Sequence, residues 1–338
     1  MTLNTIWFVL LAVLLAGYAV LDGFDLGVGM LHPLARDDRE RRLFLNSIGP
    51  LWDGNEVWLV TFGGALFAMF PEAYATILSG FYLAFVLLLF ALIFRAVSIE
   101  FRGKVEAPGW QRAWDRAFFG SSLGATFLFG VAVGNGVRGV PLDERGVFVG
   151  RFLDLLGPYQ LLVGLLTVSL FALHGAIYLY LKTEGRVQDR LGPWMWHAWG
   201  TFTALYMLVT IYTLMDVPEA AANFRRYPWA ATAVVLNVLG IAYLPRALYL
   251  RHYGRAFAAS SFTIVALVFL FAMALYPNVL TASNDPALSL TIYGAASSRT
   301  TLRIGLLIAG IGMPFVLAYT GVVYWTFRGK VRLDESSY

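Results

Sequence analysis

Long apolar segments recur along the whole chain and restrict its fold more than any other feature. A helix that crosses a bilayer needs about 20 mostly apolar residues. Nine segments meet this requirement, at about 6–30, 50–70, 74–97, 117–137, 158–181, 198–215, 229–249, 256–276 and 304–327. Only 14% of the residues are charged, whereas soluble domains carry about 25%. We therefore expect an all-α polytopic membrane protein in which residues 1–338 form a single transmembrane domain.

The distribution of lysine and arginine predicts how these spans are oriented. With nine crossings, the loops on one side and the C-terminal tail hold 18 of the 25 basic residues, and the other side holds 7. Cytoplasmic loops are enriched in basic residues, so we expect the N-terminus outside and the C-terminus in the cytoplasm. The basic stretches at 36–42 and 95–116 are interpreted as topology signals and lipid-headgroup contacts. The few residues around Pro71 predict a tight helical hairpin between the second and third spans.

The scarcity of metal ligands excludes several kinds of site. The chain contains no cysteine and only four histidines. It therefore has no disulfide, no thiolate iron–sulfur or zinc site and no covalent haem attachment of the C-x-x-C-H type. We expect no metal ion to be ligated by this chain. The apolar composition also excludes a soluble domain, a disordered chain and a nucleic-acid-binding protein.

Four carboxylates lie inside or at the start of the first two spans. Asp22 and Asp25 are three residues apart, as are Asp53 and Glu56, and residues at this spacing share a helix face. An ionisable side chain at the centre of a span costs about 2.5–3.5 kcal/mol and is by default a functional hypothesis. The predicted orientation places both pairs toward the cytoplasmic half of the bilayer.

Two interpretations of these carboxylates stay open at this point. They form a proton or cation path, which the amide of Asn55 extends as part of a hydrogen-bonded chain. Alternatively, they cap helices, line a solvated vestibule, or pair with Arg36 or Arg42.

Other polar residues near the spans favour structural roles. We expect His174 to be a packed, hydrogen-bonded side chain rather than a haem ligand. Arg95 and Glu100 end the third span, where we expect them to extend toward the membrane interface. The loop at 277–298 is interpreted as an ordered external cap, with a quinone or partner contact as the alternative.

Pairs of small residues predict close helix contacts. Such pairs separated by three residues occur at Gly23 and Gly27, at Gly120 and Gly124, and at Gly130 and Gly134.

Several stretches, in order along the chain, carry a resemblance to a known family. They are LDGFDLGVGM at 21–30, Arg41-Arg42, NSIGP at 46–50, WDGNEVWL at 52–59 and GGALFA at 63–68. Together they resemble subunit II of the cytochrome bd-type quinol oxidases. The Asp-Gly-Phe-Asp and Trp-Asp-Gly-Asn-Glu-Val-Trp motifs are specific to that family, and the resemblance extends over nearly the whole chain.

The resemblance implies a role in aerobic respiration at the bacterial cytoplasmic membrane. The family's complex oxidises quinol and reduces O2 to water. Two b-type haems and one d-type haem are held by subunit I, so the chain itself ligates none and is expected to be inactive alone. The implied fold is two four-helix bundles plus one further helix, packed against subunit I as a pseudo-symmetric heterodimer. Ubiquinol or menaquinol, haem d or b at the third site, a structural quinone or phospholipid, and small single-span accessory subunits all stay open.

The resemblance also assigns expected roles to individual residues. It implies that Asp53 belongs to a cytoplasmic proton path that leads toward the haems. We expect the path to comprise Asp53, Glu56, Asp22, Asp25 and Asn55. We expect packing toward the partner or haem side from Trp52, Trp58, Gly23 and Gly27. The family is associated with both Glu and Gln at the position of Glu56. Two other hypotheses are a proton-coupled secondary transporter and a scaffold without a role in proton delivery.

Overall fold

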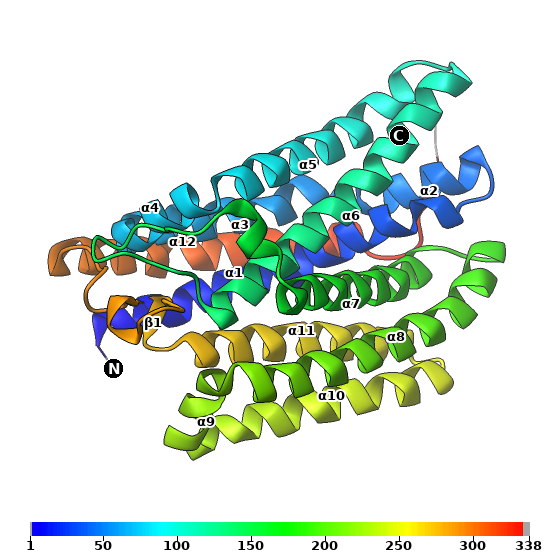
Figure 1. The fold of residues 1–338 in the computed structure, drawn as a ribbon. Helices are drawn as coiled ribbons and strands as arrows, with labels where there is room; N and C mark the ends of the chain where they lie inside the picture. The colour runs from blue at the N-terminus through cyan, green and yellow to red at the C-terminus, as the bar shows by residue number, and fades with distance from the viewer. Residues whose placement is uncertain (1, 334–338) are drawn as a thin grey trace.

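The protein is a bundle of long helices that run side by side along one axis (Figure 1). The computed structural model describes residues 2–333. The long helices are α1 (Leu3–Leu31), α3 (Trp52–Met69), α5 (Tyr82–Phe101), α6 (Pro108–Arg138), α7 (Pro158–Lys182), α8 (Arg186–Asp216), α10 (Ala231–Tyr249), α11 (Tyr253–Leu275) and α12 (Arg299–Thr326). The shorter helices are α2 (Asp38–Ile48), α4 (Pro71–Gly80) and α9 (Ala222–Arg226). One small antiparallel sheet pairs β1 (Asn278–Leu280) with β2 (Leu290–Thr291).

Within residues 2–333, eight helices are long and apolar enough to cross a membrane, which supports a polytopic membrane protein. The predicted span at 50–70 is the one outside this set. It corresponds to α3, whose first two turns contain Asp53, Asn55 and Glu56. These polar side chains lower the mean hydropathy of α3, which has only 18 residues. The count of nine crossings therefore stays a prediction.

Two span boundaries differ from the sequence prediction. The segment 198–215 is the second half of α8, a helix of 31 residues that continues through Pro193. The segment 74–97 is divided at Phe81 between α4 and α5. The predicted tight turn around Pro71 is present, because only Phe70 separates α3 from α4 and the two helices contact each other.

Helix α7 forms the centre of the core. Of the residues in its apolar window, 72% are buried, and it contacts α1, α6, α8 and α11. Its contact with α1 is very close at Gly27. A Cβ atom added there would lie 2.2 Å from the carbonyl oxygen of Phe171 and 2.8 Å from Cα of Gly175. Such a separation is impossible for a real side chain, so glycine is what allows the two backbones to meet.

The other small-residue pairs have different outcomes. Gly130 and Gly134 face α7, with backbone atoms of α7 within 3 Å of a built Cβ, so a close contact is confirmed there. Gly120 and Gly124 have no described atom within 4 Å of a built Cβ. The predicted helix contact at that pair is therefore absent from the described part of the chain.

The end of the bundle that holds the N-terminus is closed by the segment after α11. In addition to the β1–β2 pairing, the side chain of Asn284 accepts from the amide of Leu142 (3.0 Å) and donates to its carbonyl (2.8 Å). The indole of Trp7 donates to the carbonyl of Leu302 (2.9 Å). These contacts confirm the expected ordered cap.

Helix α12 lies on the outer surface of the bundle and is highly exposed within the described chain. None of the residues in the apolar window of α12 is buried within the described chain. Neighbouring α3 also exposes apolar residues, among them Val57, Val60 and Phe67. The two helices contact each other, so their outer faces together make one exposed apolar surface, called here the α3–α12 face.

Candidate functional site

A polar cluster lies between α1, α3 and α5, inside an otherwise apolar bundle. Its strongest contact joins Asp22 of α1 to Arg95 of α5. The guanidinium donates from both terminal nitrogens, at 2.8 Å to one carboxylate oxygen and 2.5 Å to the other. Both side chains are fully buried. A bidentate pair of this kind is geometrically specific, and burial removes the screening that weakens surface ion pairs.

The position of Arg95 corrects the sequence interpretation. The side chain does not extend to the membrane interface, because α5 continues for six residues beyond it and buries it against α1. Of the alternatives left open for the four carboxylates, Asp22 therefore shows an ion pair, with Arg95 as its partner and not Arg36 or Arg42. The four carboxylates thus have a basic partner at their own depth.

Asp25 belongs to a second part of the same cluster. Its carboxylate accepts a hydrogen bond from the side-chain amide of Asn55 on α3 (2.7 Å). The amide oxygen of Asn55 accepts in turn from the hydroxyl of Tyr324 on α12 (2.8 Å). The second carboxylate oxygen of Asp25 is buried without a hydrogen-bond partner among the described residues. These contacts tie α1, α3 and α12 together around one buried carboxylate.

Asp53 and Glu56 lie toward the outside of this cluster. Asp53 is exposed in the first turn of α3, and Glu56 is half-buried one turn further on. The charge of Glu56 interacts with those of Arg95, Asp22 and Asp53. The two acids therefore lie on α3 at the outer side of the cluster, whereas Asp22 and Arg95 are buried within it.

The predicted packing residues surround the same cluster. Trp58 is buried against α1 at Gly17, where a built Cβ would lie 2.2 Å from the indole ring. Trp52 is half-buried and packs against the main core. Gly23 faces the ring of Phe171 on α7, at 3.1 Å from a built Cβ. The expectation that these side chains pack toward a partner or a haem stays a prediction.

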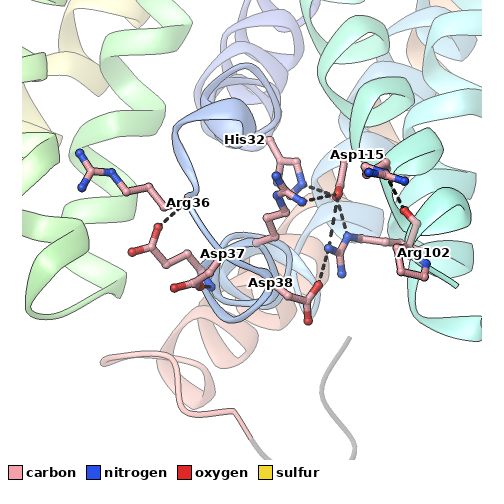
Figure 2. Close-up of polar contacts among 10 residues, drawn as sticks. His32, Arg36, Asp37, Asp38, Arg102 and Asp115 are labelled. Carbon is pink, nitrogen blue, oxygen red and sulfur yellow. Dashed lines mark hydrogen bonds and ion pairs between the residues drawn. The ribbon is translucent and has the colours of Figure 1, made fainter. Parts of the chain in front are cut away.

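A second polar network lies at the end of the bundle opposite the N-terminus. Figure 2 shows its contacts. Asp115 of α6 accepts hydrogen bonds from His32 (2.7 Å), Arg41 (3.2 Å) and Arg102 (2.5 Å). Arg102 also donates to Asp38 at the start of α2 (2.7 Å).

This network extends to α8 and corrects the interpretation of the basic stretches. Glu40 accepts from the backbone amide of Arg36 (2.7 Å) and pairs with Arg190 of α8. Arg41 and Arg102 pair with Asp115 inside the protein. They are therefore not simply lipid contacts. The sequence offered no signal for this pairing, since the partners are 74 and 13 residues apart.

His174 is confirmed as a packed, hydrogen-bonded side chain. One ring nitrogen lies 2.7 Å from the hydroxyl of Ser260, and the other lies 3.1 Å from the carbonyl of Val20. The ring stacks on Phe257. Both nitrogens are thus engaged, which does not fit an axial haem ligand. Among residues 2–333, no group of three or more His, Asp or Glu side chains is arranged to hold a metal ion.

Comparison with known proteins identifies the family. The sequence model described as "Cytochrome bd terminal oxidase subunit II" matches residues 3–327. The chain is also 38% identical to cytochrome bd-I ubiquinol oxidase subunit 2 of Escherichia coli (strain K12), covering 98% of this chain and 96% of that protein. The chain belongs to the cytochrome bd terminal oxidase subunit II family. A further member, cytochrome bd ubiquinol oxidase subunit 2 of Bacillus subtilis (strain 168), is 34% identical, with 99% and 98% covered.

A solved structure supports the fold of this subunit II. The bd oxidase from Geobacillus thermodenitrificans contains a chain that superposes with a TM-score of 0.78 at 20% identity, covering 97% of this chain and 99% of that one. At this identity the likeness shows the fold alone. Family membership makes the chain a multi-pass membrane subunit of a respiratory oxidoreductase complex that carries haems and contains a subunit I. Family membership therefore favours an oxidase subunit over the transporter hypothesis.

Proposed function

We propose that this chain acts as the non-haem subunit of a quinol:O2 oxidoreductase in the bacterial cytoplasmic membrane. Its named relatives act on ubiquinol, and we take quinol and O2 as the substrates of the whole complex. Two b-type haems and one d-type haem then belong to subunit I, and the isolated chain is inactive. The engagement of both nitrogens of His174 supports this division of labour.

We propose nine crossings, with the N-terminus outside, for the subunit in its membrane. Helices α1, α3, α5 and α6 then make one four-helix bundle, α7, α8, α10 and α11 make the second, and α12 is the further helix. The contacts of α1 with α3 and α6, of α5 with α6, and of α7 with α8 and α11 support this grouping.

The α3–α12 face is the proposed contact with subunit I. The observation that carries this assignment is the exposed carboxylate of Asp53 at one end of an apolar helix face. A carboxylate turned toward hydrocarbon is costly, so charged residues in spans face protein or water. Covering α3 and α12 with a second protein removes this cost and shields the apolar residues between Asp53 and Phe67.

Asp53 and Glu56 are the proposed proton carriers of the path. Both are carboxylates on the exposed side of the cluster, and each can take up and release a proton. Asp22 is held by Arg95 in a bidentate pair. Its proposed role is that of a fixed negative charge in the cluster. An amide does not readily exchange protons, so Asn55 orients Asp25 by its hydrogen bond. The path then runs from the cytoplasm along Asp53 and Glu56 into the partner.

The test is the turnover of the purified complex carrying Asp53→Asn. A positioned proton-transfer group contributes about 10²–10⁴-fold to rate, so we expect O2 consumption to fall by about 100-fold. The reduced-minus-oxidised haem spectrum should be nearly unchanged, because all the haems belong to subunit I in this proposal. Asp53→Glu should retain most of the activity.

The matched control is Glu106→Gln, which removes an exposed carboxylate from the α5–α6 loop. Its turnover should equal that of the wild type. Full turnover in Asp53→Asn would remove Asp53 from the path and favour the scaffold hypothesis. A complex without haem bands would contradict the assignment of the chain to an oxidase altogether.

A further inference from the structure

An apolar groove lies between α10 and α11. These two helices lie on the side of the bundle away from α5 (Figure 1). Its volume is about 530 Å³. The lining residues include Leu236, Leu239, Gly240 and Tyr243 of α10, and Arg255 and Phe262 of α11. The side chains of Leu239 and Phe262 are 58% and 43% exposed. The groove is therefore open to the surroundings of the bundle and has an arginine at one end.

The groove is short enough to lie within one leaflet of a bilayer. Arg255 and Phe262 are seven residues apart on α11, which corresponds to about 10 Å along the helix. The hydrocarbon core is about 30 Å thick, so each leaflet contributes about half of that. The groove thus starts at the end of the helices and extends into a single leaflet, as the acyl chain of one lipid does.

The charged residues at this end of α10 and α11 are all basic. Arg246, Arg251 and Arg255 all lie in or beside the turn between α10 and α11, and all are exposed. None of them forms an ion pair with a carboxylate of residues 2–333. The sequence contains no Asp or Glu between positions 220 and 284, so no nearby acid on these helices neutralises them. The positive-inside distribution assigns this turn to the cytoplasmic side, where the leaflet is rich in anionic lipid.

We propose that the α10–α11 groove binds one anionic diacyl phospholipid of the cytoplasmic leaflet. The phosphate lies at Arg255, with Arg246 and Arg251 supplying further positive charge at the headgroup. An acyl chain lies along Leu239 and Phe262. The absence of a side chain at Gly240 keeps the floor of the groove open, because a built Cβ there would lie 3.1 Å from the ring of Phe262.

The test uses the whole detergent-purified complex after removal of bound lipid. It is titrated with dioleoyl phosphatidylglycerol, with dioleoyl phosphatidylcholine of the same acyl chains, or with inorganic phosphate, and bound lipid is counted by native mass spectrometry. We expect one phosphatidylglycerol to bind about fivefold more weakly in Arg255→Gln, since each basic residue near an anionic surface contributes about that factor. Ala258→Phe fills the groove from an exposed position and should abolish that binding.

The matched control is Arg145→Gln, which removes an exposed arginine from the loop after α6 and should leave the binding unchanged. The haem spectrum of each variant reports that the complex is assembled. Equal binding of phosphatidylcholine would contradict the selectivity for an anionic headgroup. Displacement by inorganic phosphate would contradict the role of the acyl chain, and unchanged binding in both groove variants would overturn the site.

Discussion

At the scale of single residues, the buried pair of Asp22 and Arg95 could not be predicted from the sequence. The two residues are 73 positions apart and belong to different helices, so no local pattern joins them. The apolar segment at 74–97 predicts that Arg95 lies near the membrane interface. The helix continues to Phe101 instead. Removing one partner of such a pair leaves an uncompensated charge inside the protein.

Asp22→Asn is therefore expected to destabilise the assembled complex. Breaking a buried pair by removing one charge costs about 3–5 kcal/mol. We expect a lower yield of complex and faster thermal loss of the haem spectrum. The double variant Asp22→Asn with Arg95→Gln removes both charges of the pair and should recover part of the loss. Wild-type yield and thermal behaviour in Asp22→Asn alone would contradict a stabilising role for the pair.

At the scale of elements, the contact between α1 and α7 depends on glycine. The long apolar segments and the small-residue pairs predicted the helices and a close contact at Gly27. The same pattern predicted a contact at Gly124 that the described chain does not make. A small-residue pair allows close approach but does not determine which helix comes near. That choice depends on the packing of segments distant in sequence, as do the break at Phe81 and the pairing of Asp115 with Arg41.

Gly27→Ala and Gly124→Ala form a matched pair of variants. The added methyl group in Gly27→Ala would lie 2.2 Å from the Phe171 carbonyl oxygen, so α1 and α7 must separate. Overpacking of this kind costs about 1–3 kcal/mol, and the midpoint of thermal loss of the haem spectrum should fall. Gly124→Ala adds its methyl group to open space and should leave the midpoint unchanged. Equal midpoints in the two variants would show that the α1–α7 contact adapts without cost.

At the scale of the whole molecule, two outer surfaces of the bundle differ in chemistry. The α3–α12 face is apolar and carries Asp53 at one end, whereas the groove of α10 and α11 carries only positive charge. The sequence predicted a membrane protein and its family, because composition and motifs are local properties. It did not predict which side of the bundle meets subunit I, since that depends on which helices the fold leaves uncovered.

Photo-crosslinking tests whether subunit I covers the α3–α12 face. We would replace Phe315, which is 74% exposed on α12, by p-benzoylphenylalanine, and Val235, which is 57% exposed on α10, in a matched variant. Irradiation of the purified complex is expected to join subunit I to the chain labelled at Phe315, and to join only lipid or detergent to the chain labelled at Val235. Crosslinking of subunit I from Val235, with none from Phe315, would contradict the account.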